Sequence, residues 1–90
     1  MPDDWSLFNT QSMLGAALTG QQKFAEAEPL LLAGYEGLKQ RRDQIPAAAK
    51  AVIPDSLQRL VALYTGWQKP TEAAKWQGVL DAVEAAQSFQ

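Results

Sequence analysis

Apolar side chains recur along this chain at intervals of three and four residues, which is the pattern of amphipathic α-helices. The pattern covers four segments, at about 4–20, 23–43, 55–67 and 70–87. Asp3 or Asp4 can cap the first segment, and Gly20 is expected to end it. The second segment continues through Pro29, which removes one backbone donor and is expected to shape how that helix leaves the preceding turn. The chain is therefore expected to be all-α.

Short connections should fold these segments into pairs. The links that follow the first and third segments are only a few residues long, so each pair is expected to form an antiparallel hairpin. Between the pairs, residues 44–54 read as a linker punctuated by Pro46 and Pro54, with a helical turn over 47–52 and a break near Pro54. We thus expect one domain, 1–90, with hairpins at about 4–43 and 55–87.

The two hairpins share a sequence pattern at a constant offset of 46 residues, the distance from Ala27 to Ala73. No gap interrupts the alignment. The matched pairs are Leu14 with Leu60, Leu18 with Tyr64, Thr19-Gly20 with Thr65-Gly66, Gln22-Lys23 with Gln68-Lys69, and Glu26-Ala27 with Glu72-Ala73. Two copies of one hairpin are expected to stack side by side.

The repeated residues resemble a tetratricopeptide repeat. In the first copy they are Leu14-Gly15, Leu18, Phe24 and Ala27, and in the second they are Leu60, Val61, Tyr64, Pro70 and Ala73. The typical repeat has a period of ~34 residues, and the longer offset here is similar to the kinesin-light-chain-like variety. The stretches "MPDDW" and "KFAEAEPL" are similar to bacterial repeats of this kind, which are often joined to serine/threonine protein kinase domains. The resemblance implies a right-handed α-solenoid of 4–5 helices, a scaffold for protein–protein interaction.

The resemblance also implies a concave groove, lined by the first helix of each hairpin, for a protein or peptide partner. The expected lining residues are Asn9, Ser12, Ala16, Thr19, Asp55, Gln58, Ala62 and Thr65. Family members that hold a peptide carboxylate use a basic and polar clamp, and its positions here are Ser12, Ala16, Gln58 and Ala62. None of these supplies a cation. We therefore expect an extended peptide bound by a small, nearly uncharged surface.

A second hypothesis follows from the number of repeats. About three are usually needed to bury a continuous core, and this chain carries two. It is either part of a longer array or a small protein that closes its open ends by self-association, as a homodimer. Trp5 and Phe8 lie where an upstream repeat would pack, so they are the expected contact residues, together with the surface of the fourth helix. In that case the chain is a dimerisation or array-capping unit without a peptide ligand of its own.

Composition argues against several kinds of chemistry. The chain has no cysteine and no histidine, which excludes disulfides, thiol nucleophiles, Ser-His-Asp triads and Cys/His zinc sites. Glu26, Glu28 and Glu36 have neither metal-ligand spacing nor a phosphate-binding loop beside them, and we interpret them as structural. We expect no enzymatic activity and no cofactor or metal.

Charge and hydropathy limit the classes of partner that the chain is expected to have. The net charge of −2 argues against sequence-independent binding to nucleic acid. The basic cluster at Lys39, Arg41 and Arg42 reads as a solvated helix end, where cations complement the helix dipole. No apolar run approaches the ~20 residues of a membrane span, and the N-terminus lacks the pattern of a signal peptide. The expected location is cytoplasmic, without membrane insertion.

Overall fold

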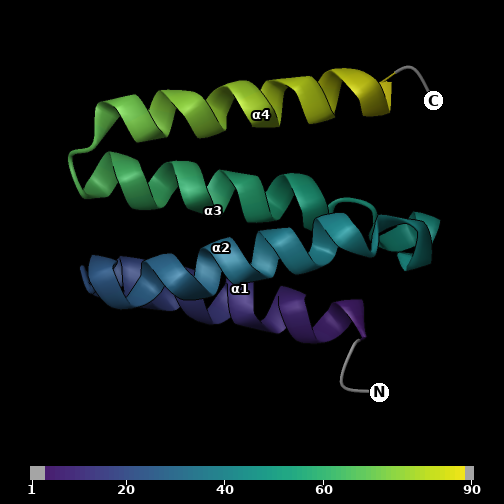
Figure 1. Ribbon diagram of the computed structural model, residues 1–90, viewed down its shortest axis with the longest axis horizontal. Helices are drawn as coiled ribbons and strands as arrows, with labels where there is room; N and C mark the ends of the chain where they lie inside the picture. The colour runs from purple at the N-terminus through teal and green to yellow at the C-terminus, as the bar shows by residue number, and fades with distance from the viewer. Residues whose placement is uncertain (1–3, 89–90) are drawn as a thin grey trace.

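The computed structural model describes residues 4–88, and in this range the chain forms four α-helices and no strand (Figure 1). The helices are α1 (Trp5–Gly20), α2 (Phe24–Gln40), α3 (Val52–Gly66) and α4 (Pro70–Ser88). Two short 3-10 helices, η1 (Arg42–Gln44) and η2 (Ala47–Ala49), connect α2 to α3. The predicted all-α fold of antiparallel hairpins is confirmed.

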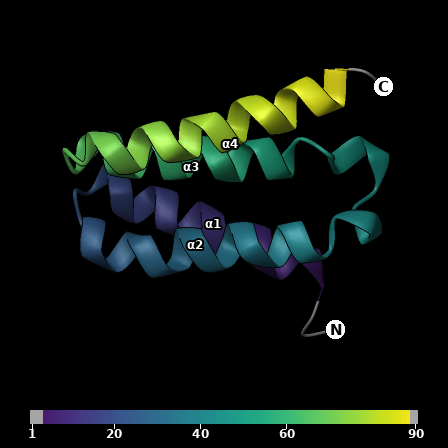
Figure 2. The ribbon, with the colours of Figure 1, turned by 45° about the horizontal axis from the view of Figure 1, so that its top comes forward.

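The helices are arranged as two hairpins, one laid against the other. Figure 1 shows the α1–α2 turn and the α3–α4 turn at the same end of the molecule, with the connection through η1 and η2 at the opposite end. Figure 2 separates the pair α1–α2 from the pair α3–α4. Helix α3 packs against both α1 and α2, and α4 packs mainly against α3. The second hairpin is therefore held to the first largely through α3.

One predicted helix cap is present, and two helix boundaries differ from the sequence prediction. Asp4 caps α1, with its side chain accepting from the backbone N–H of Ser6 at 3.4 Å, whereas Asp3 lies outside the described residues. Helix α2 ends at Gln40, earlier than expected, and η1 follows it. Helix α3 begins at Val52, so Pro54 lies inside its first turn rather than at a break. A proline there removes no intrahelical hydrogen bond, because the first N–H groups of a helix have no partner within it.

Most of the core lies between α2 and α3. Leu31 and Leu38 from α2, and Leu57, Leu60 and Leu63 from α3, have no exposed surface. Burying a leucine side chain contributes about 1.5–3 kcal/mol each. The remaining buried apolar residues are Ala27, Tyr35, Ile45, Ile53, Tyr64 and Leu80. The buried side chains of α2 are thus covered on their inner face by α3.

Glycines bring α1 and α2 into close contact. A Cβ atom added to Gly34 would lie 2.9 Å from the backbone oxygen of Phe8, and one added to Gly37 would overlap the Phe8 ring. A Cβ atom at Gly15 would lie 2.6 Å from Cγ of Leu31. Glycine inside a helix otherwise costs about 1 kcal/mol. Close packing of the two helices is the physical reason for glycine at these positions.

Candidate functional site

The 46-residue offset seen in the sequence is also present in the backbone at the two hairpin turns. Gln22 and Gln68, which are 46 positions apart, have φ values of 63° and 60°. The N–H of Lys23 donates to the carbonyl of Leu18 at 2.9 Å, and the N–H of Lys69 donates to that of Tyr64 at 2.8 Å. This is the Schellman motif, in which a left-handed residue closes the helix. The left-handed residue is a glutamine, and Gly20, expected to end the helix, is its last helical residue.

Side-chain hydrogen bonds join the hairpins in the described part of the chain. The phenol of Tyr64 on α3 donates to a carboxylate oxygen of Glu28 on α2 at 2.7 Å. Nη1 of Arg59 on α3 donates to the Ser12 hydroxyl on α1 at 3.0 Å. Burial, and then the hydrogen bond to Glu28, raises the pKa of Tyr64 above its ordinary value of 10.0. These contacts fix how α3 sits on the first hairpin, because each requires one particular register.

The α1 half of the predicted groove is largely covered by α3. Ser12 has no exposed surface, so its predicted place in an open groove is wrong: α3 packs over it and Arg59 occupies its hydroxyl. Asn9, Ala16 and Thr19 are half-buried, and the Thr19 hydroxyl donates to the carbonyl of Gly15 at 2.9 Å. Asn9 keeps one buried side-chain oxygen without a hydrogen-bond partner. Participation of these three in binding stays a prediction.

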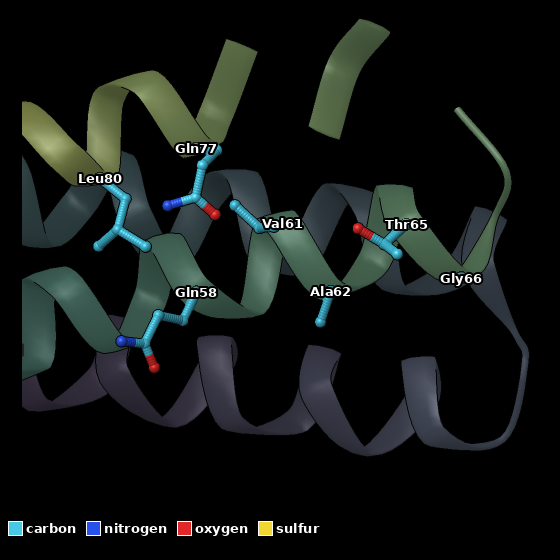
Figure 3. Close-up of a pocket in the computed structure, with 7 residues that line it drawn as sticks. All are labelled: Gln58, Val61, Ala62, Thr65, Gly66, Gln77 and Leu80. Atoms are coloured by element: carbon cyan, nitrogen blue, oxygen red, sulfur yellow. The ribbon is translucent and has the colours of Figure 1, made fainter. Parts of the chain in front are cut away.

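The α3 half of the predicted groove is exposed and lies beside a hollow between α3 and α4. Asp55, Gln58, Ala62 and Thr65 are all exposed. The hollow has a volume of ≈ 500 Å³ and is lined by Gln58, Val61, Ala62, Thr65, Gly66, Gln77 and Leu80. In Figure 3, Gln77 and Leu80 of α4 reach toward α3, whereas Ala62 points away from α4. Three predicted groove residues therefore share a surface with α4, which the sequence had not indicated.

The hollow has a counterpart in the first hairpin. Subtracting 46 from its lining positions gives Ser12, Gly15, Ala16, Thr19, Gly20, Leu31 and Gly34 on α1 and α2. Of these, Ser12 and Leu31 are fully buried, and Ser12 bonds to Arg59 of α3. The first hairpin is thus covered by a helix where the second hairpin is open. The hollow is the equivalent of a helix-docking surface.

The aromatic residues pack between helices. Trp67 stacks on Phe24, with ring centroids 6.0 Å apart, and Trp76 meets Tyr35 edge-on at 5.5 Å. Trp5 and Phe8, expected at an open end, are only partly exposed and pack against the core, and the Arg41 guanidinium lies 4.4 Å from the centre of the Phe8 ring. Self-association through Trp5 and Phe8 stays a prediction.

Other apolar side chains on α1 are more open to solvent. Leu7, Met13 and Leu14 are 43%, 53% and 54% exposed, and they are the large apolar residues recorded as exposed in the described part of the chain. Leu14 is one of the residues that the two hairpins share at the 46-residue offset. Its repeat partner Leu60 has no exposed surface. The two leucines differ in exposure because α3 packs against the first hairpin, whereas within the described residues no hairpin packs against the corresponding face of α1.

Glu28 of the acidic cluster and Arg41 of the basic cluster have structural partners. Glu28 receives the Tyr64 hydrogen bond, and Arg41 donates to the carbonyl of Gly37 at 3.3 Å near the end of α2. Within residues 4–88, no group of three or more His, Cys, Asp or Glu side chains is placed to hold a metal ion. None of the helices in the same range is long and apolar enough to cross a membrane.

Comparison with known proteins adds no relative: no family model, curated protein or solved structure matches the chain. The features that bear on function are therefore geometric. They are the duplicated hairpin, the hollow between α3 and α4, and the exposed apolar side chains of α1.

Proposed function

We propose that the chain is a non-catalytic protein-interaction module, a scaffold of tetratricopeptide-like hairpins in a right-handed α-solenoid. The observation that supports this most is the second hairpin, which repeats the turn of the first at the same offset and packs on it through α3. Stacked helical hairpins characteristically bind partners along their extended surfaces. A cytoplasmic bacterial setting, and a parent protein that carries a kinase domain, belong to the same proposal through the family resemblance.

The surface best suited to a partner is the exposed side of α3 with the facing part of α4. Gln58 and Gln77 each offer amide donors and an acceptor without a net charge. Ala62 and Thr65 are small, so a peptide backbone can approach α3 closely. These features suit an extended, uncharged peptide segment that hydrogen-bonds to the two amides. Binding is expected to be weak, because the hollow is open and few polar groups converge on it.

A synthetic peptide array tests this proposal. The wild-type chain is compared with the double variant Gln58→Ala/Gln77→Ala and with Gln40→Ala, a matched loss of an exposed amide outside the hollow. We expect a set of peptides whose binding weakens about 10-fold or more in the double variant, since two hydrogen bonds are lost. The Gln40→Ala chain should bind like the wild type. The proposal fails if no peptide distinguishes the double variant from Gln40→Ala.

A second candidate function is that of an array-capping unit without a ligand. One observation favours it. Gln77, Asp81 and Glu84 are exposed on α4, at positions equivalent to the buried Leu31, Tyr35 and Leu38 of α2. Terminal repeats of helical arrays carry a polar outer face of this kind. If the chain is a capping unit, neither the wild type nor the two variants should bind any peptide of the array.

A further inference from the structure

The outward face of α1 combines exposed apolar side chains with a complete lack of charge. From Trp5 to Gln22 the sequence holds no Asp, Glu, Lys or Arg. Leu7 and Leu14, seven residues apart, lie along one line of this face. Beside them runs a second line of exposed residues at alternating intervals of four and three: Ser6, Thr10, Met13 and Ala17. We call these six residues the α1 face. Such spacing keeps side chains in line along a helix, as in helix–helix contacts.

In the second hairpin, the face equivalent to the α1 face is largely buried. The positions equivalent to Leu7 and Leu14 are Ile53 and Leu60 on α3, and both are buried. They are buried because α3 docks on the first hairpin. The α1 face is thus a surface that the fold covers with another helix wherever one is present. In α1 the same surface is open.

A head-to-tail stack of two copies is a poor way to cover it. The α1 face of one copy would then lie on the surface of the second hairpin in another. That surface carries exposed Asp81 and Glu84, where the first hairpin has buried Tyr35 and Leu38. Removing carboxylates from water against leucine side chains is unfavourable without a partner cation. The α1 face supplies no such cation.

We propose that the occupant is the α1 face of a second copy, in a two-fold symmetric dimer. In a two-fold contact the same patch meets itself. Any charged side chain on the patch would therefore lie close to the identical charge on the second copy. The α1 face avoids this repulsion because it is uncharged. Ser6, Thr10 and Ala17 are small enough to let two helices approach, and Leu7, Met13 and Leu14 exclude water beside them.

The size of the face sets the strength of the dimer. A helix of 16 residues is about 24 Å long. One pair of such helices buries less than the ~800 Å² per partner of a standard stable interface. The dimer is therefore expected to dissociate in the micromolar range, on the order of 1–100 μM.

Sedimentation velocity over about 1 μM to 1 mM tests this association. The wild type should shift from monomer to dimer, and Leu14→Glu should raise the dissociation constant at least ~30-fold, because it places two like charges in the contact. Gln77→Glu adds the same charge to the hollow between α3 and α4 and should leave the dimer intact. Circular dichroism of both variants confirms that they fold. Since Leu14 is more than half exposed, its replacement should not unfold the monomer.

A cross-linking experiment identifies the face directly. The chain has no cysteine, so one introduced thiol reports on one position. Under mild oxidation Thr10→Cys should form a disulfide-linked dimer readily, whereas Gln77→Cys should not. A monomer at every concentration overturns the proposal. A dimer that both Leu14→Glu and Gln77→Glu disrupt would show a head-to-tail contact and overturn it as well. So would a dimer that only Gln77→Glu disrupts, or one that neither substitution affects. These outcomes report on association of the chain with itself and not on peptide binding.

Discussion

Leu14 and Leu60 occupy equivalent positions of the two hairpins and provide a matched pair of substitutions. Leu60 has no exposed surface, whereas Leu14 is 54% exposed. Replacing a buried leucine by alanine removes its transfer free energy and leaves a cavity, which together cost about 2–5 kcal/mol. A chain of this length is expected to have a total stability of about 5–13 kcal/mol. We therefore expect Leu60→Ala, at ~3 kcal/mol, to lower the melting temperature by roughly 12–24 °C.

Leu14→Ala should cost far less. A fully buried leucine contributes about 1.5–3 kcal/mol, and Leu14 remains about half in water, so the loss should be below ~1 kcal/mol without a cavity term. Urea and thermal unfolding followed by circular dichroism measure both variants. The measurements should be made below about 1 μM, so that association through the α1 face contributes little to stability. Equal destabilisation by the two substitutions would show that α1 is covered as α3 is, and would refute the reasoning.

Three further predictions test the turns, the close packing and the contact between hairpins. Gln22→Gly and Gln68→Gly should each stabilise the chain by about 0.5–1 kcal/mol in urea unfolding, because glycine adopts a positive φ without strain; a loss in both would contradict the turn geometry. Gly37→Ala should destabilise by about 1–3 kcal/mol through overlap with a neighbouring ring, whereas Gly78→Ala, in open space on α4, should stabilise by about 0.5–1 kcal/mol. The pKa of Tyr64 is raised in the folded state above 10.0, so the contribution of Tyr64 to the stability of the fold is complete below pH 10 and declines as the pH rises further. Tyr64→Phe should therefore reduce the fall in melting temperature between pH 9 and about pH 11.

The fold could be predicted because local pattern and short connections leave few alternatives. Helical spacing defined four segments, and turns of a few residues required antiparallel pairs. The helix boundary near Pro54 was harder to predict from the sequence, because a proline is compatible both with a break and with the first turn of a helix. Which of the two occurs depends on the burial of Ile53 and Leu57 against the first hairpin, a tertiary effect that the local sequence does not contain.

The candidate site was predicted in part. The exposed residues Gln58, Ala62 and Thr65 were expected from the family resemblance, and the structure adds Gln77 of α4 beside them. Ser12 was misplaced for a reason that the repeat itself creates. Equivalent positions in two copies have equivalent local structure but different neighbours. Ser12 has α3 above it, whereas the described chain places no further hairpin over Gln58.

The same asymmetry explains why the two ends of the molecule differ. Each copy has a face that docks onto the preceding hairpin and a face that receives the following one. On α1 the docking face keeps Leu7 and Leu14, so it still has the chemistry of a buried surface. On α4 the receiving face has Asp81 and Glu84, so it has the chemistry of a solvated surface. An apolar face remains favourable only if something covers it, and its lack of charge makes a second copy compatible with it. Self-association is therefore expected at the α1 end rather than at the α4 end.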